Sequence, residues 1–326
     1  MNRLIRLAGL LGLSLLAGCQ PADDGAALAP FPSRSVTLVV PFPPGGGTDA
    51  LARQLAPKLA EAWGQAVVVK NLAGASGQIA EAHVLNVAHD GHTVLFNNSS
   101  QVMSPAVLVP EQAGKPSPLA ALAQVALSSS VLIVPQDSPF KSVAEVLQQA
   151  RQGTVFYASC GVGTPQHWMG MALAKQDAPG LKHVPYKGCA PALIDVVSGQ
   201  VAVGMVTESS ALPMIESGKV RALGVTAAQP SPWLPEVPVQ SQWLGAEVSL
   251  DQWYGFFVPA DVPAPVQQAL SQTLLASVDD EAMQQALRPL GFTISVLGAA
   301  AFQDLVQRQR AYFNQQAQAQ RQLEGQ

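Results

Sequence analysis

The sequence predicts an α/β fold built as two lobes, each a mainly parallel sheet flanked by helices, with two strands crossing between the lobes. Short apolar runs rich in Val and Ile alternate with helical patterns, and Gly-rich loops stand between them. This strand–loop–helix unit occurs in both halves of the chain. The length of 326 residues agrees with about two domains of ordinary size.

In the first half, residues 36–40 (VTLVV) predict a strand, and residues 41–47 (PFPPGGG) predict a loop. Thr48 or Asp49 then begins a helix whose apolar positions recur every three to four residues. Further strands are predicted at 66–70 and 93–96, and a helix over about 78–88 follows a second Gly-rich turn at 74–77.

In the second half, the unit recurs with strands at 131–134, 154–158 and 183–185 and with helices over about 142–151, from 166 and over 192–198. Ser142 and Glu145 form a capping-box pattern at the start of one of these helices. Strands are also predicted at 201–206, 220–226 and 253–258, and helices over about 264–278, 280–290 and 299–318.

Two apolar strands, residues 131–134 and 256–258, are each followed by a proline and suit a pair of crossover strands. We therefore predict one lobe over residues 34–134 plus 253–326 and the other over 135–252.

The composition excludes several classes of protein. Hydrophobic residues make up 48% of the chain and charged residues 12%, which is enough apolar material for a large core and rules out a disordered chain. The 18 Lys and Arg against 22 Asp and Glu give a net charge of −4, and no basic block occurs. Nucleic acid is therefore not an expected partner.

The first residues predict export. Arg3 and Arg6 precede an apolar stretch at 7–16, which is too short to span a bilayer. It ends in Leu-Ala-Gly-Cys19, which resembles a bacterial lipobox, so we predict a lipoprotein signal peptide at 1–18, an acylated Cys19 and a tether at 19–33. An ordinary secretory signal with a chance cysteine is the alternative. Gln20 favours the outer membrane in a Gram-negative host, and two or more acyl chains anchor stably.

Two cysteines remain after the signal region, Cys160 and Cys189. Export implies an oxidising compartment, where a disulfide between them would persist. Two unpaired, partly buried thiols are the alternative.

The Gly-rich loops all follow predicted strands, and in an open α/β sheet ligands bind outside the carboxyl ends of the strands. These loops are rich in Gly, Ser and Thr and almost free of Lys and Arg. An anion there must be held by backbone N–H groups and helix N-termini. Asp49 either caps its helix or contacts the ligand directly or through water, and His167 either bonds in the cleft or packs at a helix start.

Catalytic patterns are weak. Residues 45–50 fit a dinucleotide loop, but the following strand ends in Lys70-Asn71 without an acidic residue for a ribose. Ser138 and Lys141 fit S-x-x-K, but the capping box starts the helix at Ser142, after that lysine. No G-x-S-x-G or H-E-x-x-H occurs. We expect no enzyme, no cofactor and no metal.

Ordered motifs carry a family resemblance. They are VPFPPGGGTD at 40–49, GASG at 74–77, HVPYKG at 183–188, GKVRAL at 218–223 and LPEVP at 234–238. With these motifs the chain resembles the substrate-binding proteins of tripartite tricarboxylate transporters, the Bug family, from about residue 31 to the C-terminus.

The resemblance implies a two-lobed periplasmic binding protein fold of type II whose interlobe cleft captures a small carboxylate, such as a di- or tricarboxylate, an amino acid or an aromatic acid. It implies a periplasmic monomer that delivers this ligand to a membrane permease; a tethered sensor that reports carboxylates to a signalling partner is the alternative. Carried over by position, the ligand contacts are Phe42, Gly46, Thr48, Asp49, Ala75, Gly77, Ser99, Ser159, Gly163, Thr164, His167, Lys187 and Glu208. Glu208 could pair with an amino group of the ligand, or it is a solvent-facing loop residue.

Overall fold

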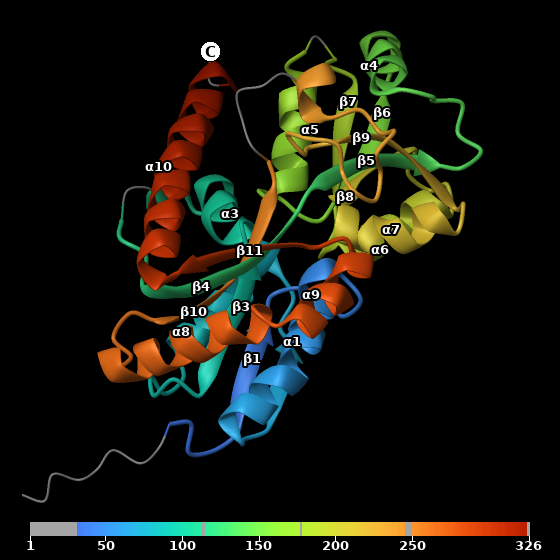
Figure 1. The fold of residues 1–326 in the computed structure, drawn as a ribbon. Coiled ribbons are helices and arrows are strands. Elements are labelled where there is room, and N and C mark those ends of the chain that lie inside the picture. Colours follow the sequence, from blue (N-terminus) through green and yellow to red (C-terminus); the bar gives the residue numbers. More distant parts are fainter. Residues whose placement is uncertain (1–30, 113–114, 177, 245–249, 325–326) are drawn as a thin grey trace, which may run out of the picture. The chain divides into compact units, whose positions relative to one another are not determined.

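The computed structural model describes residues 31–112, 115–176, 178–244 and 250–324. The predicted signal peptide at 1–18, Cys19 and the tether up to residue 30 lie outside the described residues. Figure 1 shows the helices and strands of the fold, coloured by their position in the sequence.

Six strands form the first sheet, in the order β11-β4-β10-β3-β1-β2. The strands are β1 (Val36–Val40), β2 (Val67–Asn71), β3 (Thr93–Asn98), β4 (Leu119–Ser128), β10 (Gln252–Pro259) and β11 (Thr293–Gly298). The helices of this lobe are α1 (Gly47–Trp63), α2 (Gln78–Leu85), α3 (Ser100–Leu108), α8 (Ala264–Val278), α9 (Glu281–Leu287) and α10 (Ala299–Glu324), with the short 3-10 turns η1 (Ala75–Gly77), η2 (Pro110–Gln112) and η4 (Arg288–Leu290).

Five strands form the second sheet, in the order β7-β6-β8-β5-β9. They are β5 (Ser130–Pro135), β6 (Val155–Ser159), β7 (Leu181–Pro185), β8 (Val203–Thr207) and β9 (Val220–Val225). The helices of this lobe are α4 (Val143–Gln152), α5 (Pro165–Ala174), α6 (Cys189–Val197) and α7 (Glu208–Glu216), with the 3-10 turn η3 (Gln240–Gln242).

The two-lobed α/β prediction is confirmed, but both sheets are mixed rather than mainly parallel. The strands of the predicted strand–loop–helix units, β1, β2 and β3, pair in parallel. The long strands β10, β4 and β11 pair antiparallel. In the second sheet, β5 likewise pairs antiparallel with β8 and β9. Every antiparallel pair therefore includes β4, β5 or β10, the strands at which the chain passes from one sheet to the other.

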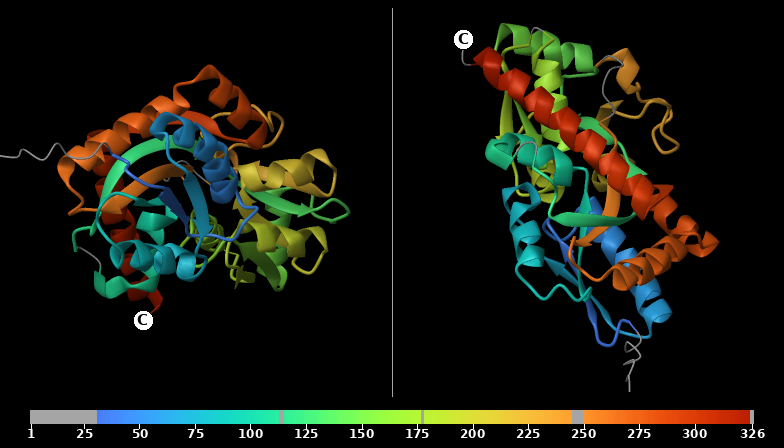
Figure 2. Two further views of the ribbon diagram at one scale, coloured as in Figure 1. Left: turned by 90° about the horizontal axis from the view of Figure 1, so that it is seen from below. Right: turned by 90° about the vertical axis from the view of Figure 1, so that its left-hand side faces the viewer.

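Alternating side chains bury both faces of each sheet. In β1, Leu38 faces a cluster with Leu51 and Leu55 of α1, whereas Val39 faces a cluster with Val102 of α3 and Phe302 of α10. Successive residues of a strand point to opposite faces, so helices cover the first sheet on both sides. Figure 2 shows this arrangement, with α1 and α8 on one side and α3 and α10 on the other.

The second sheet is covered in the same way. Its face toward α6 and α7 packs Ile133, Val196 and Leu212 together.

The Ser142 side chain accepts the Glu145 N–H and caps α4, as its sequence pattern predicts. Each capping bond of this kind contributes about 1 kcal/mol to helix stability.

The chain changes sheets earlier than its sequence suggests. β4 ends at Ser128 in the first sheet and β5 begins at Ser130 in the second. Residues 131–134, which we placed in the first lobe, therefore pair with strands of the second sheet. The reverse crossing enters the first sheet at β10, close to the predicted return at residue 253.

Within the described residues, no helix combines the length and apolar character that a bilayer crossing requires.

Candidate functional site

A small cavity lies between the two lobes where several strand ends meet. It has a volume of about 20 Å³, which is room for about one water molecule. The first lobe contributes Phe42, Gly46, Gly47, Thr48, Asn98, Ser100, Gln252 and Tyr254, and the second contributes Cys160, Thr164, Gln166, Cys189 and Thr207.

Five helices begin at this cavity. Gly47 and Ser100 are the first residues of α1 and α3, and Cys189 is the first residue of α6. Thr164 and Thr207 are the N-caps of α5 and α7. A helix N-terminus carries a partial positive charge and free N–H groups. No charged side chain is among the described residues that line the cavity, so an anion there would be bound by backbone N–H groups and hydroxyls.

Asp49 holds the first Gly-rich loop in place. Its carboxylate accepts the Gly45 N–H at 3.0 Å, the Nε–H of Arg53 at 3.0 Å and the side-chain amide of Asn71 at 2.9 Å. Burial by itself would raise the pKa of this carboxyl, but the hydrogen bonds from Arg53, Gly45 and Asn71 outweigh burial and lower it. Asp49 is therefore ionised and occupied within its own lobe, and it does not line the cavity.

The lobes touch directly above the cavity. The Gly47 N–H donates to Oγ of Ser210 in α7 at 3.1 Å. Gly163, at a φ of +76°, lies so close to Ser104 of α3 that an added Cβ would be 2.6 Å from the Ser104 Cα. Only glycine fits there, because both the positive φ and the contact exclude a side chain.

A series of hydrogen-bonded amide and hydroxyl side chains lies at one side of the cavity. The Gln166 side chain donates to Ser130 Oγ at 2.9 Å and to Gln252 Oε1 at 3.1 Å. Gln252 in turn donates to the hydroxyl of Tyr254 at 2.9 Å. These bonds connect α5 with the crossover strands β5 and β10, so the cavity and the crossover between the sheets share side chains.

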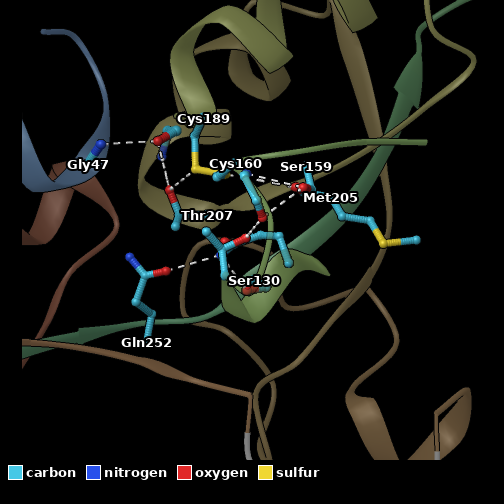
Figure 3. Close-up of a disulfide and its surroundings, with 12 residues drawn as sticks. Gly47, Ser130, Ser159, Cys160, Cys189, Met205, Thr207 and Gln252 are labelled. Atoms are coloured by element: carbon cyan, nitrogen blue, oxygen red, sulfur yellow. Dashed lines mark hydrogen bonds between the residues drawn. A yellow bond between two sulfur atoms is a disulfide. The ribbon is translucent and has the colours of Figure 1, made fainter. Parts of the chain in front are cut away.

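Cys160 and Cys189 form a disulfide, which resolves the alternatives that the sequence left open. It joins the loop after β6 to the first residue of α6, and both cysteines line the cavity. Figure 3 shows the disulfide beside Thr207, whose hydroxyl donates to Cys189 Sγ, with Gly47 approaching from the first lobe. The bridge therefore ties the loop that leads into α5 to the start of α6.

The structure brings together only part of the site expected from the family resemblance. Phe42, Gly46, Thr48 and Thr164 line the cavity. Ala75, Gly77, Ser99, Ser159, Gly163 and Lys187 do not. Ser99 is the N-cap of α3 and Ala75 and Gly77 form η1, while Lys187 is exposed.

Several cavity residues were absent from the predicted contacts. Asn98, Ser100 and Thr207 directly follow or end buried strands, so the strand-end rule could have found them. Gln252 and Tyr254 lie in a buried strand rich in aromatic residues and carry no such signal.

His167 lies away from the interlobe cavity. Its Nδ1 accepts the Gly163 N–H at 3.0 Å, and its ring stacks on His183 with centroids 4.1 Å apart. Burial lowers the pKa of His167 to about 4. Burial, together with the neighbouring His167, lowers the pKa of His183 to about 3. Both rings are therefore neutral at pH 7, and His167 positions the loop that carries Gly163.

Glu208 is neither a loop residue nor solvent-facing. It begins α7, is 1% exposed and accepts a hydrogen bond from the Ser231 hydroxyl. Burial raises its pKa to about 7; the Ser231 bond opposes this rise and the nearby Asp251 adds to it. Its backbone N–H donates to the Ser129 carbonyl at 2.8 Å, between β4 and β5, so Glu208 lies against the crossover between the sheets and does not line the cavity.

No group of three or more His, Cys, Asp or Glu side chains in the described part of the chain is placed to hold a metal ion.

Comparison with known families gives a match over residues 51–319 to the family described as "Tripartite tricarboxylate transporter family receptor". A protein from Pseudomonas sp. (strain P51), described as a UPF0065 protein in the tcbD-tcbE intergenic region, is 38% identical over 266 residues, covering 80% of this chain and 79% of its own. Protein BugT of Bordetella pertussis is 29% identical over 300 residues, covering 90% of each chain.

Solved structures with the same fold include MatC from Rhodopseudomonas palustris with bound malate. It has a TM-score of 0.80 and 27% identity, and the match covers 88% of this chain and 100% of that one. R. palustris Rpa4515 with adipate has a TM-score of 0.81 and 29% identity, and covers 88% of this chain and 97% of that one.

Proposed function

The chain belongs to the tripartite tricarboxylate transporter receptor family, and on this premise we propose that it captures a small carboxylate between its lobes and delivers it to a membrane permease. The candidate ligands are di- and tricarboxylates, amino acids and aromatic acids. The observation that carries the proposal is the convergence of five helix N-termini on one cavity. The malate and adipate named for two structural neighbours are carboxylates of this kind.

The lining of the cavity fits a carboxylate better than a cation. Hydroxyls of Thr48, Thr164 and Thr207 and the amides of Asn98, Gln166 and Gln252 surround it. Carboxylate oxygens only accept hydrogen bonds. The Thr48 hydroxyl accepts from Asn98 and keeps its own proton for a ligand, and the lining brings no competing counter-charge. We propose binding without catalysis, since the lining holds no base beside a nucleophile.

Ligand entry requires the lobes to separate. A cavity of about 20 Å³ is far below the ~300 Å³ or more of ordinary ligand pockets. The crossover strands β4–β5 and β10 offer a hinge, and the contacts of Gly47 and Gly163 with the opposite lobe would break when it opens. We propose residues 34–128 plus 252–326 as one moving body and residues 130–251 as the other, with the boundary where the chain changes sheets.

We propose further that Cys19 is acylated after cleavage of residues 1–18 and holds the protein at the periplasmic side of a membrane, the outer membrane in a Gram-negative host. The permease subunits of a tripartite transporter are the proposed partner, and the receptor acts as a monomer. A tethered sensor that passes the signal to another protein remains the second candidate, which the anchor predicted at Cys19 would suit equally well.

Thermal unfolding of the full chain with a panel of carboxylates tests the binding proposal. A ligand at about 100 times its dissociation constant adds roughly 2.7 kcal/mol to the free energy of unfolding. A selective rise in melting temperature is the expected result. No rise with any member of the panel, in protein whose denatured supernatant contains no released organic acid, would overturn it. Uptake of the identified ligand by cells lacking the gene then separates transport, which requires the receptor, from sensing, which does not.

A further inference from the structure

A second cavity, of about 620 Å³, also lies between elements of the two lobes, but away from the strand ends that form the first cavity. Helix α5 and strand β7 of the second lobe form one side, and α3 and the end of α10 form the other. It shares no lining residue with the interlobe cavity. Its volume falls within the range of about 300–1,000 Å³ that is typical of small-molecule sites.

Helix α10 completes this second cavity from the other lobe. It starts beside the first sheet and extends to the level of α5, as both side views of the ribbon show (Figures 1 and 2). The rings of Trp168 in α5 and Phe313 in α10 lie 5.1 Å apart, and the Arg321 guanidinium donates to the Ala106 carbonyl in α3 at 3.0 Å. These contacts tie the end of α10 to both of its neighbours.

Flat rings line one wall of the cavity. Tyr157 stacks on His183 at 5.0 Å, and His183 stacks on His167 at 4.1 Å. Because Nδ1 of the neutral His167 accepts the Gly163 N–H, its proton is on Nε2, which leaves an N–H donor on the ring. Because the stacked rings cover one another's faces and Tyr157 is 2% exposed, the wall offers uncharged ring edges together with one hydrogen-bond donor.

The rim of the cavity is positively charged. Lys175, Lys182 and Arg321 line it, and no Asp or Glu is among its described lining residues. Neither lysine forms an ion pair within the part of the chain that the structure describes. Three cations with no carboxylate among the described lining residues attract an anion, and salt screens such exposed charges.

We propose that this second cavity binds a flat organic anion, with its ring against the Tyr157–His183–His167 wall and its acidic group toward Lys175 and Lys182. The site is independent of the carboxylate captured between the lobes. A flat aromatic ring packs edge-to-face against such ring edges, and the rim supplies the charge complement.

Calorimetric titration of the full chain with naphthalene-2-sulfonate tests the proposal, because this probe is flat, anionic and not a carboxylate. The double variant K175E/K182E reverses the rim charge. The variant K70E/K219E makes the same change in net charge at two exposed lysines outside the cavity. Naphthalene-2-sulfonamide is the matched neutral probe.

The expected result is binding of the sulfonate that weakens by roughly tenfold or more in K175E/K182E, a change of about 1.4 kcal/mol. K70E/K219E should stay close to the original affinity, and added salt should weaken binding only where the rim lysines are present. Absence of binding, equal affinity for the neutral probe or equal affinity in the two double variants would overturn the proposal. If affinity is retained in K175E/K182E and lost in G47V, the sulfonate occupies the cavity between the lobes instead.

Discussion

The backbone N–H of Gly47 donates to the Ser210 hydroxyl across the cleft, over 3.1 Å. The donor is the first N–H of α1, and the acceptor lies in the first turn of α7, where Thr207 accepts the Ser210 N–H as N-cap. The bond thus joins two helix starts from different lobes. A carboxylate between the lobes would be bound by backbone N–H groups of the same kind. Lobe closure and ligand binding therefore use the same helix starts.

Gly47→Val is expected to abolish ligand-induced stabilisation while the protein still folds. An added Cβ at residue 47 would strike the Ser209 side chain of the opposite lobe and lie 3.3 Å from the Tyr254 hydroxyl. Most of this clash disappears when the lobes separate. The variant should therefore fold, but its lobes should be unable to close. Thermal unfolding with and without the best carboxylate of the panel measures both quantities.

Gly153→Val is the matched control for that variant. Gly153 lies at the end of α4 with extended backbone, and the nearest atom to an added Cβ is 3.8 Å away. It should keep the full ligand-induced shift. A normal shift in Gly47→Val as well would mean that the ligand does not need this closed arrangement.

Asp49→Ala should destabilise the protein by about 1–3 kcal/mol, because the Gly45 N–H and the Asn71 amide lose a charged acceptor. The loss should also weaken carboxylate binding, since the Gly-rich loop is no longer held. Urea unfolding measures stability and calorimetric titration measures affinity. Glu61→Ala, at an exposed position of the same helix, should stay within about 0.5 kcal/mol; equal effects of the two changes would contradict the role given to Asp49.

Replacing both cysteines by alanine should lower the free energy of unfolding by about 3–4 kcal/mol, as expected for a disulfide that closes a loop of this length. The separation of Cys160 and Cys189 is 29 residues. Affinity for the carboxylate should fall as well, because the bridge holds the loop before α5 against the start of α6. Reducing the original protein should reproduce both changes, and an unaltered urea midpoint after reduction would show that the bridge does not stabilise the native state.

The strand–loop–helix units were predictable because local chemistry determines them. Val-rich runs and Gly-rich turns located β1, β2 and β3, and Ser142 located the start of α4. The helices α3 and α7 were missed; each has an internal proline, Pro105 or Pro213, that weakens its helical pattern.

Strand β4 was missed for a different reason. Its sequence, LAALAQVALS, consists of residues with high helix propensity, yet it lies between β10 and β11 and is buried on both faces. Burial in the middle of a sheet overrides intrinsic preference. Gln252 and Tyr254 lie in β10, where the chain returns to the first sheet. Only this tertiary arrangement places them at the cavity.

The buried hinge carboxyl of Glu208 should make stability fall as pH rises. Its pKa is raised from 4.5 to about 7, so the unfolded chain ionises first and the native state is increasingly penalised between these two values. Above about pH 7 both states are ionised, and the full cost is of the order of 3 kcal/mol. Glu208→Gln keeps an acceptor for Ser231 and should be more stable than the original protein at pH 8 and similar at pH 4. Urea midpoints across this range measure the difference; parallel curves would contradict it.

The stacked histidines should act in the opposite direction. The pKa of His167 is lowered from 6.5 to about 4 and that of His183 to about 3. Below about pH 6.5 these two histidines are therefore protonated in the unfolded chain but stay neutral in the native state. The free energy of unfolding consequently decreases as the pH falls toward 4. In a Glu208→Gln background, which removes the opposing change, the urea midpoint should rise between about pH 4.5 and 7. His183→Phe keeps a ring between Tyr157 and His167 but removes one of these protons, so the rise should become shallower. An unchanged slope would mean that His183 is already charged in the native protein, which its stacking against His167 makes unfavourable.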